Sequence, residues 1–357
     1  MNNIKAIAEI SMLFILSACF ARAEEKFSNP LEPLKALKIT YVRDANIWVA
    51  NGDGTDQKRI IENGQFPSWS PDRKQIAFVR DRNIWVATAD GSNQRPLTFQ
   101  WKKDDPLLKS ELMDIKISWN PRYDSVTFSH QELFEIERVN GIEGLTPYPR
   151  NAPKNIIMGC SIFDVQVNGE APKKALPRYD LYGHEGGTDN YFVDQNFPSW
   201  SRSGKRLAFT RAGDIWVTEV IEKEDKEDIE NFDVTRVAAV ASYDEPTLRA
   251  SRNNLMATTL SWTPDEKQIL YGYERYEGSG TEEVHLLDVE SGKDIRLLGD
   301  TTVIRPTLSP DGKFIVYQSW VCADDKSGKA VRACLWVASV DGEIKQEIVS
   351  NGIEANW

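Results

Sequence analysis

From residue 38 to its end, the chain alternates apolar and polar residues in short runs. The runs QIAFV (75–79) and NIWVA (83–87) are rich in β-branched and aromatic residues, and turn-forming Pro, Asp, Gly and Asn separate such runs. This period-two alternation is typical of half-buried antiparallel β-strands. Helical periodicity is weak, and the best candidate for one short helix is LLKSELMDI (107–115). The pattern therefore predicts an all-β protein.

The predicted strands belong to a repeated unit. FPSW occurs at 66–69 and at 197–200, and both times an aromatic residue follows the Trp after nine positions and an Ile after fifteen. Each unit is interpreted as four short strands joined by tight turns such as SPDGK. We expect these anchors and aromatic residues in the core between stacked units. The nine-residue spacing holds for Trp69 and Phe78, Trp119 and Phe128, Trp200 and Phe209, Trp262 and Tyr271, and Leu308 and Tyr317.

Four-stranded units repeated around an axis form a β-propeller. The unit at 38–61 lacks an opening strand, and the chain finishes with IEANW (353–357), which resembles the FPSW strand with nothing after it. We expect 353–357 to complete the first blade and so to close the ring without free sheet edges. The prediction is one six-bladed propeller over residues 38–357.

The repeat resembles that of TolB-type propellers, whose units carry P-x-W-S-P-D-G-K followed by I-A-F and I-W-V. The copies at 66–98 and 197–217 match closely, those at 260–271 and 304–317 match well, and 117–128 is degraded. The resemblance covers almost all of 38–357 and implies a role in docking envelope proteins. TolB carries an α/β domain before its propeller that has no counterpart here, so functions tied to that domain are not carried over.

The extra residues of the longer units concentrate on one predicted face. In an antiparallel blade, the turns between strands 2 and 3 and the connections between blades lie at one end, which we call the loop face. The 1–2 and 3–4 turns lie at the other end, the turn face. Only 221–233 adds residues to the turn face. The loop face receives 99–116, 130–155, 178–196, 242–257, 273–283 and the segment between Cys322 and Cys334.

Long ordered loops usually have a function, so the loop face is the predicted ligand face. The alternative is that these loops cover the propeller end and bind nothing. Their mixture of aromatic residues, Arg and carboxylates is typical of a protein or peptide interface. The loop residues selected as candidates are Trp101, Tyr182, His184 and Tyr191.

The repeat also aligns one position, two residues after the strand-2 aromatic residue, that should emerge on the loop face. Its Arg and His residues are candidates for binding an anionic group such as a terminal carboxylate. The structural alternative is local pairing of the arginines with Asp44 and Asp81. The aligned residues are Arg43, Arg80, His130, Arg211, Tyr273 and Ser319.

Charge and the N-terminus suggest where the protein works. The formal net charge is -11, with no Lys/Arg-rich run, which argues against a nucleic-acid partner. Residues 1–23 are interpreted as a secretory signal. Cleavage after Ala23 and lipidation at Cys19 are both compatible with the sequence, and 24–37 is a linker or tether. We expect a monomer in the bacterial periplasm, secreted, or held as an outer-membrane lipoprotein, touching the membrane only through a lipid anchor.

Export permits disulfide bonds. Cys322 and Cys334 flank a polar stretch and are expected to pair, which would stabilise the fold by about 2–3 kcal/mol. Cys160 lies in an apolar run and is interpreted as a buried free thiol.

No familiar catalytic motif is present. The three histidines, His130, His184 and His285, do not form HExxH or a spaced Cys/His pattern, and there is no G-x-S-x-G. We therefore expect no metal and no cofactor. The most site-like stretch is GHEGGTDN (183–190). The sequence favours an envelope-protein or peptide-binding propeller over the alternative, a polysaccharide lyase or hydrolase that uses His184 and Glu185.

Overall fold

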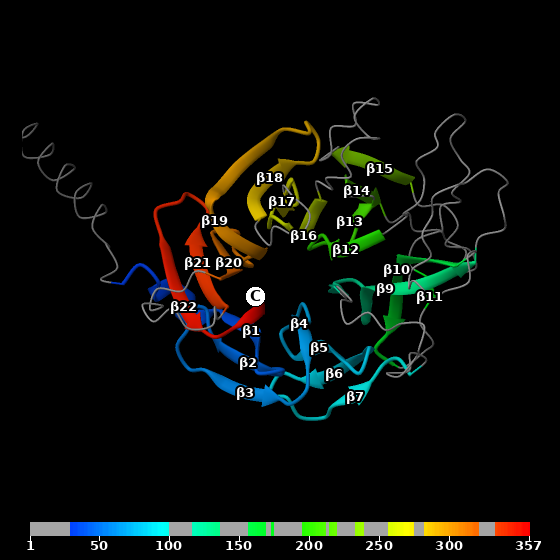
Figure 1. Ribbon diagram of the computed structural model, residues 1–357, viewed down its shortest axis with the longest axis horizontal. Coiled ribbons are helices and arrows are strands. Elements are labelled where there is room, and N and C mark those ends of the chain that lie inside the picture. Colours follow the sequence, from blue (N-terminus) through cyan, green and yellow to red (C-terminus); the bar gives the residue numbers. More distant parts are fainter. Residues whose placement is uncertain are drawn as a thin grey trace, which may run out of the picture.

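The computed structural model describes residues 29–99, 116–135, 156–168, 173–174, 195–211, 214–219, 233–238, 256–274, 282–320 and 333–357. These residues form antiparallel sheets arranged around a common axis, in sequence order (Figure 1). The all-β, six-bladed propeller predicted from the repeat is confirmed.

Within each blade, we number the strands 1 to 4 outward from the propeller axis. Blade 1 contains β23 (Ile353–Asn356), β1 (Lys38–Arg43), β2 (Asn46–Asn51) and β3 (Lys58–Ile61). Blade 2 contains β4 (Gln65–Trp69), β5 (Gln75–Arg80), β6 (Asn83–Thr88) and β7 (Arg95–Pro96). Blade 3 contains β8 (Ile117–Asn120), β9 (Ser125–Glu135), β10 (Ile156–Gln166) and β11 (Lys173–Lys174).

Blade 4 contains β12 (Gln195–Trp200), β13 (Arg206–Arg211), β14 (Asp214–Glu219) and β15 (Asp233–Ala238). Blade 5 contains β16 (Met256–Trp262), β17 (Gln268–Glu274), β18 (Glu282–Asp288) and the first part of β19 (Asp294–Leu308). Blade 6 contains the rest of β19, β20 (Phe314–Ser319), β21 (Cys334–Ser339) and β22 (Lys345–Ser350). Strand β19 pairs first with β18 and then with β20, so it is the outermost strand of blade 5 and the innermost strand of blade 6.

The C-terminal strand closes the ring, as predicted. Strand β23 pairs antiparallel with β1, with Thr40 opposite Asn356 and Val42 opposite Ile353. Trp357 then occupies the anchor position of blade 1, and its side chain is buried. The two ends of the propeller therefore share one sheet, and β1 is paired on both sides, with β23 and with β2.

The anchor tryptophans tie neighbouring blades together. The indole Nε1 donates to a backbone carbonyl of the preceding blade in three cases: Trp119 to Ser68 (2.9 Å), Trp262 to Ser199 (2.9 Å) and Trp357 to Thr307 (3.1 Å). In each case the acceptor is the residue just before the preceding anchor. These three anchors therefore lie between blades, as predicted from their spacing. Trp119, Leu308 and Trp357 are buried, and Trp69, Trp200 and Trp262 are half-buried.

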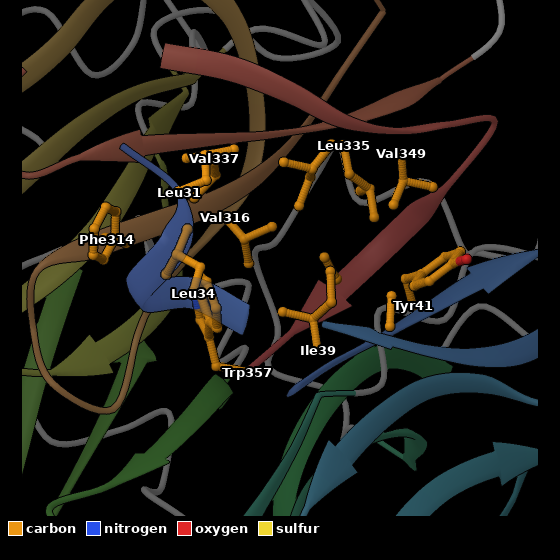
Figure 2. Close-up of a cluster of buried hydrophobic side chains, with 13 residues drawn as sticks. Leu31, Leu34, Ile39, Tyr41, Phe314, Val316, Leu335, Val337, Val349 and Trp357 are labelled. Atoms are coloured by element: carbon orange, nitrogen blue, oxygen red, sulfur yellow. The ribbon is translucent and has the colours of Figure 1, made fainter. Parts of the chain in front are cut away.

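The N-terminal segment packs against the propeller. The short 3-10 helix η1 (Glu32–Ala36) buries Leu34 in the core between blades 1 and 6, together with Leu31 (Figure 2). The amide of Gly52, in the 3–4 turn of blade 1, donates to the carbonyls of Leu34 and Leu37. The part of the predicted linker that the structure describes, 29–37, thus lies on the turn face.

The turn face is built from short turns that use a hydroxyl and a carboxylate. In the first of them, Ser70 Oγ donates to Asp72 Oδ1 (2.7 Å), which also accepts from the Lys74 amide (3.0 Å). The Gln75 amide donates to Ser70 Oγ (2.9 Å) and closes the turn. The same arrangement recurs at Thr263–Gln268, Ser309–Phe314 and Ser339–Ile344.

Candidate binding face

The described strands show where the long segments leave the sheets. Six of these segments are flanked by strand ends of 2–3 turns or inter-blade connections. They are 100–115, 136–155, 175–194, 239–255, 275–281 and 321–332. The ends that flank 220–232 belong to a 3–4 turn. The predicted division of the insertions between loop face and turn face therefore holds at the strand ends.

Arg43 ends β1 at the loop face, just before the turn at Asp44 and Ala45, both of which have positive φ. Its Nε donates to the Asn351 carbonyl (3.0 Å), and its guanidinium stacks 4.9 Å from the centre of the Trp48 ring. The Nη2 atom donates to the Ser350 carbonyl (3.1 Å) and to Gln57 Oε1 (2.9 Å).

Arg80 repeats this arrangement in blade 2. Its Nε donates to the Asn63 carbonyl (2.9 Å), and its Nη2 donates to the Glu62 carbonyl (2.6 Å) and to Gln94 Oε1 (2.8 Å). Its guanidinium lies 4.8 Å from the centre of the Trp85 ring. Both arginines thus bind the connection that arrives from the preceding blade. The structural alternative expected from the sequence was pairing with Asp44 and Asp81, and it did not include these carbonyls.

The structure gives fewer contacts for the other candidates at the aligned position. Tyr273 is half-buried on β17, and Ser319 is buried at the end of β20. The side chains of His130 and Arg211 lie outside the described part of the structure. The loop candidates Trp101, Tyr182, His184 and Tyr191, and the predicted helix at 107–115, also lie outside the described residues.

A second set of residues, which sequence reasoning missed, lies close to the propeller axis. We call it the inner ring. Its members are three positions before each anchor, at the loop-face end of the innermost strands, which surround the centre of the ring in Figure 1. Five of them have positive φ, an unusual conformation for residues other than Gly. The inner ring consists of Glu354, Phe66, Lys116, Phe197, Thr259 and Arg305 in blades 1 to 6.

Neighbours in the inner ring contact one another. Glu354 accepts from the Phe66 amide (2.8 Å) and pairs with Arg305 (3.2 Å between Oε1 and Nη1). The Arg305 guanidinium also lies 5.2 Å from the centre of the Phe66 ring, and Lys116 Nζ lies 5.7 Å from that of Phe197. The two cations come from blades 3 and 6, on opposite sides of the axis. The sequence signal was available, because the Phe of FPSW marks this position.

Among the described residues, no group of three or more His, Cys, Asp or Glu side chains is arranged to hold a metal ion. No helix in that part of the chain is long and apolar enough to cross a membrane. Cys334, at the start of β21, is a disulfide cysteine. Its predicted partner Cys322 lies outside the described residues, so this pairing stays a prediction, and so does the buried thiol of Cys160, whose side chain is not described.

Comparison with known proteins gives the same fold as the structure, a β-propeller. Residues 55–107 match the family model for the dipeptidyl peptidase IV (DPP IV) N-terminal region. TolB from Acinetobacter baumannii is 17% identical, with a TM-score of 0.56 over 90% of this chain and 66% of that one. A putative TolB from Agrobacterium tumefaciens is 13% identical, with a TM-score of 0.52 over 88% of each chain.

A chain of a nidogen/laminin complex is 10% identical, with a TM-score of 0.53 over 89% of this chain and 97% of that one. No curated protein matches the sequence. At these identities the likeness shows the fold, and the structural neighbours are TolB-like propellers, as the repeat indicated.

Proposed function

We propose that this chain is an exported binding propeller that docks a protein or peptide through its loop face. The observation that carries the proposal is the uneven distribution of its connections. Six long segments leave the sheets at the loop face, whereas the described turns of the turn face are short and held by Ser/Thr–Asp hydrogen bonds. A solvated scaffold would not need this asymmetry, whereas a binding face would.

The inner ring supplies recognition chemistry at the centre of this face. Lys116 and Arg305 offer cations and Phe66 offers an aromatic ring, and all three are partly exposed. Phe197 and Glu354 are nearly buried and support these side chains from below. Aromatic and Arg side chains near the centre of an interface often dominate its binding energy. The described N-terminal segment lies on the turn face, so a tether in front of it leaves the loop face open to a partner.

The proposal includes export to the bacterial envelope, through cleavage after Ala23 or lipidation at Cys19. The mass of the mature N-terminus distinguishes the two, because a diacylated Cys adds a lipid mass that simple cleavage does not.

A matched pair of loop replacements tests the binding face. Residues 136–155 connect the paired ends Glu135 and Ile156, and 220–232 connect the paired ends Glu219 and Asp233. Replacing either segment with Asn-Gly gives a two-residue hairpin that suits a type I′ turn. We expect the loop-face replacement to lose at least about tenfold in affinity for a partner cross-linked in the envelope, because interface hot spots contribute about 2 kcal/mol or more each.

The turn-face replacement is the control and should bind like the unmodified chain. Equal binding by both variants, with far-UV circular dichroism unchanged, would contradict the proposal.

The alternative enzyme function, with His184 and Glu185 acting on a polysaccharide, depends on residues outside the described part of the chain. Its test is His184→Ala, which would abolish release of glycan fragments from cell-wall or plant polymers.

A further inference from the structure

Blade 5 departs from blades 1 and 2 at three aligned positions. In those blades an Arg at the end of strand 2 stacks on a Trp of strand 3 and donates to the Gln just before strand 4. In blade 5 the residues in the same register are Tyr273, His285 and Asp294. The corresponding sets are Arg43, Trp48 and Gln57 in blade 1 and Arg80, Trp85 and Gln94 in blade 2.

His285 bridges two carboxylates from adjacent segments of the sheet. Its Nδ1 lies 2.7 Å from Asp294 Oδ2 on β19, and its Nε2 lies 3.3 Å from Glu283 Oε2 on β18. The other oxygen of Glu283 lies 3.4 Å from Arg296 Nη1. The side chains of His285 and Glu283 are 12% and 16% exposed, whereas that of Asp294 is 38% exposed. Solvent therefore screens the Glu283 contact less than the Asp294 contact.

Two tyrosines complete the surroundings of the imidazole. The centre of its ring lies 5.3 Å from that of Tyr271 and 5.4 Å from that of Tyr273, which meets it edge-on. Burial, with the charge of Asp294 and a hydrogen bond to it, raises the pKa of Tyr271, so this hydroxyl keeps its proton. From blade 4, the described side chains packed in the same cluster as Tyr271 include the apolar Ile215 and Val217.

The contacts of His285 depend on its protonation. An imidazole donates from both nitrogens only when it is doubly protonated, and in the neutral ring one nitrogen is an acceptor. With the proton present, charges alternate along Asp294, His285, Glu283 and Arg296. Without it, a nitrogen lone pair faces a carboxylate oxygen, and one of the two contacts must be lost.

We propose that His285 is a proton-controlled joint between β18 and β19, at the junction of blades 4 and 5. The protonated ring holds both carboxylates, and loss of the proton releases one of them and changes the packing of Tyr273. Histidine is the side chain whose charge ordinarily changes nearest to neutral pH, which is why a joint of this kind can respond to pH. Because Tyr273 lies at the loop face, an effect on partner binding would rest on the proposed function, whereas the joint itself does not.

Nuclear magnetic resonance of the full chain with labelled His and Tyr rings tests the joint between pH 5 and pH 8.5. We expect the ring signals of His285 and Tyr273 to shift with one common midpoint, and those of Tyr41 in blade 1 to stay in place. In His285→Trp, which restores the residue of blades 1, 2, 4 and 6, the Tyr273 signals should no longer depend on pH.

His130→Gln is the matched control and should leave the Tyr273 transition unchanged. If His285→Trp does not fold, His285→Gln serves with the same readout. The proposal would be overturned if the Tyr273 signals did not change with pH in the unmodified chain. It would also be overturned if they still shifted with pH in the His285 variants.

Discussion

At the residue scale, two kinds of aspartate respond to pH in opposite directions. The turn aspartates accept hydrogen bonds from a neighbouring hydroxyl and from backbone amides, which lower their pKa values. The hydroxyls of Thr88 and Ser92 and the Ser92 amide lower the pKa of Asp90 to about 2. Asp164 is different, because burial raises its pKa although Thr127 and Ser125 donate to it.

The turn aspartates predict acid sensitivity. A carboxyl group with a lowered pKa in the folded state contributes stability above its unfolded pKa of about 3.9, and this stability is lost as the pH falls through the folded value. For Asp90 the loss therefore falls between about pH 4 and pH 2. We expect Asp90→Asn to melt at a temperature that depends less on pH in this range, as scanning calorimetry would measure. An unchanged slope would contradict the prediction.

Asp164 predicts the opposite dependence. Because its pKa is raised in the folded state, its contribution to stability is fully present below the unfolded pKa and is lost as the pH rises through the folded value. Asn keeps an acceptor for Thr127 and carries no charge to bury. Urea unfolding should show Asp164→Asn gaining stability relative to the unmodified chain between pH 4 and pH 7. If the free energy of unfolding of the variant instead falls relative to the unmodified chain over this range, the carboxylate is needed in its charged form.

At the element scale, β23 is held by more than its backbone pairing with β1. The Glu354 side chain is only 9% exposed, and it links the strand to blade 6 through Arg305 and to blade 2 through the Phe66 amide. The Trp357 indole adds a further bond to blade 6. One short strand therefore fastens three blades.

Removing the Glu354 carboxylate should lower the free energy of unfolding. Glu354→Ala leaves Arg305 and the Phe66 amide without their bonds to this side chain, and breaking a half-buried pair of this kind costs about 2–3 kcal/mol. The matched control is Glu343→Ala, an exposed residue in a turn of blade 6, which should stay within about 0.5 kcal/mol. The free energy of unfolding in urea separates the two variants. Equal values would show that β23 is held by its backbone alone.

At the scale of the whole molecule, the ring needs closing because β1 would otherwise be left as an exposed edge of blade 1. The same closed ring separates the two faces, since every strand 1 runs in one direction. This is why insertions at quite different places in the chain reach the same end of the molecule.

Deleting residues 353–357 should open the ring at β1. The pairing of β1 with β23 and the burial of Trp357 are lost, and the freed edge of β1 becomes available to another chain. We expect the melting temperature to fall by more than about 10 °C and association to appear in size-exclusion chromatography with light scattering. A monomeric truncated chain with the original melting temperature would show that closure is dispensable.

The sequence by itself determined the strand pattern, the number of blades and the closure by 353–357. It could do so because these depend on local alternation and on a repeat that the chain spells out. Tertiary structure alone decided what individual side chains do there. Arg43 is bound by the Asn351 carbonyl, 308 residues away in the chain, and Lys116 meets the Phe197 ring of the next blade.

His285 was only one of three scattered histidines until the register placed it where blades 1, 2, 4 and 6 have Trp, beside two carboxylates. A strand's alternation is visible within a few residues of sequence. The partners of a side chain depend on the register between strands, as for His285, or on another blade, as for Arg43 and Lys116, and both are known only once the sheets and the ring have formed.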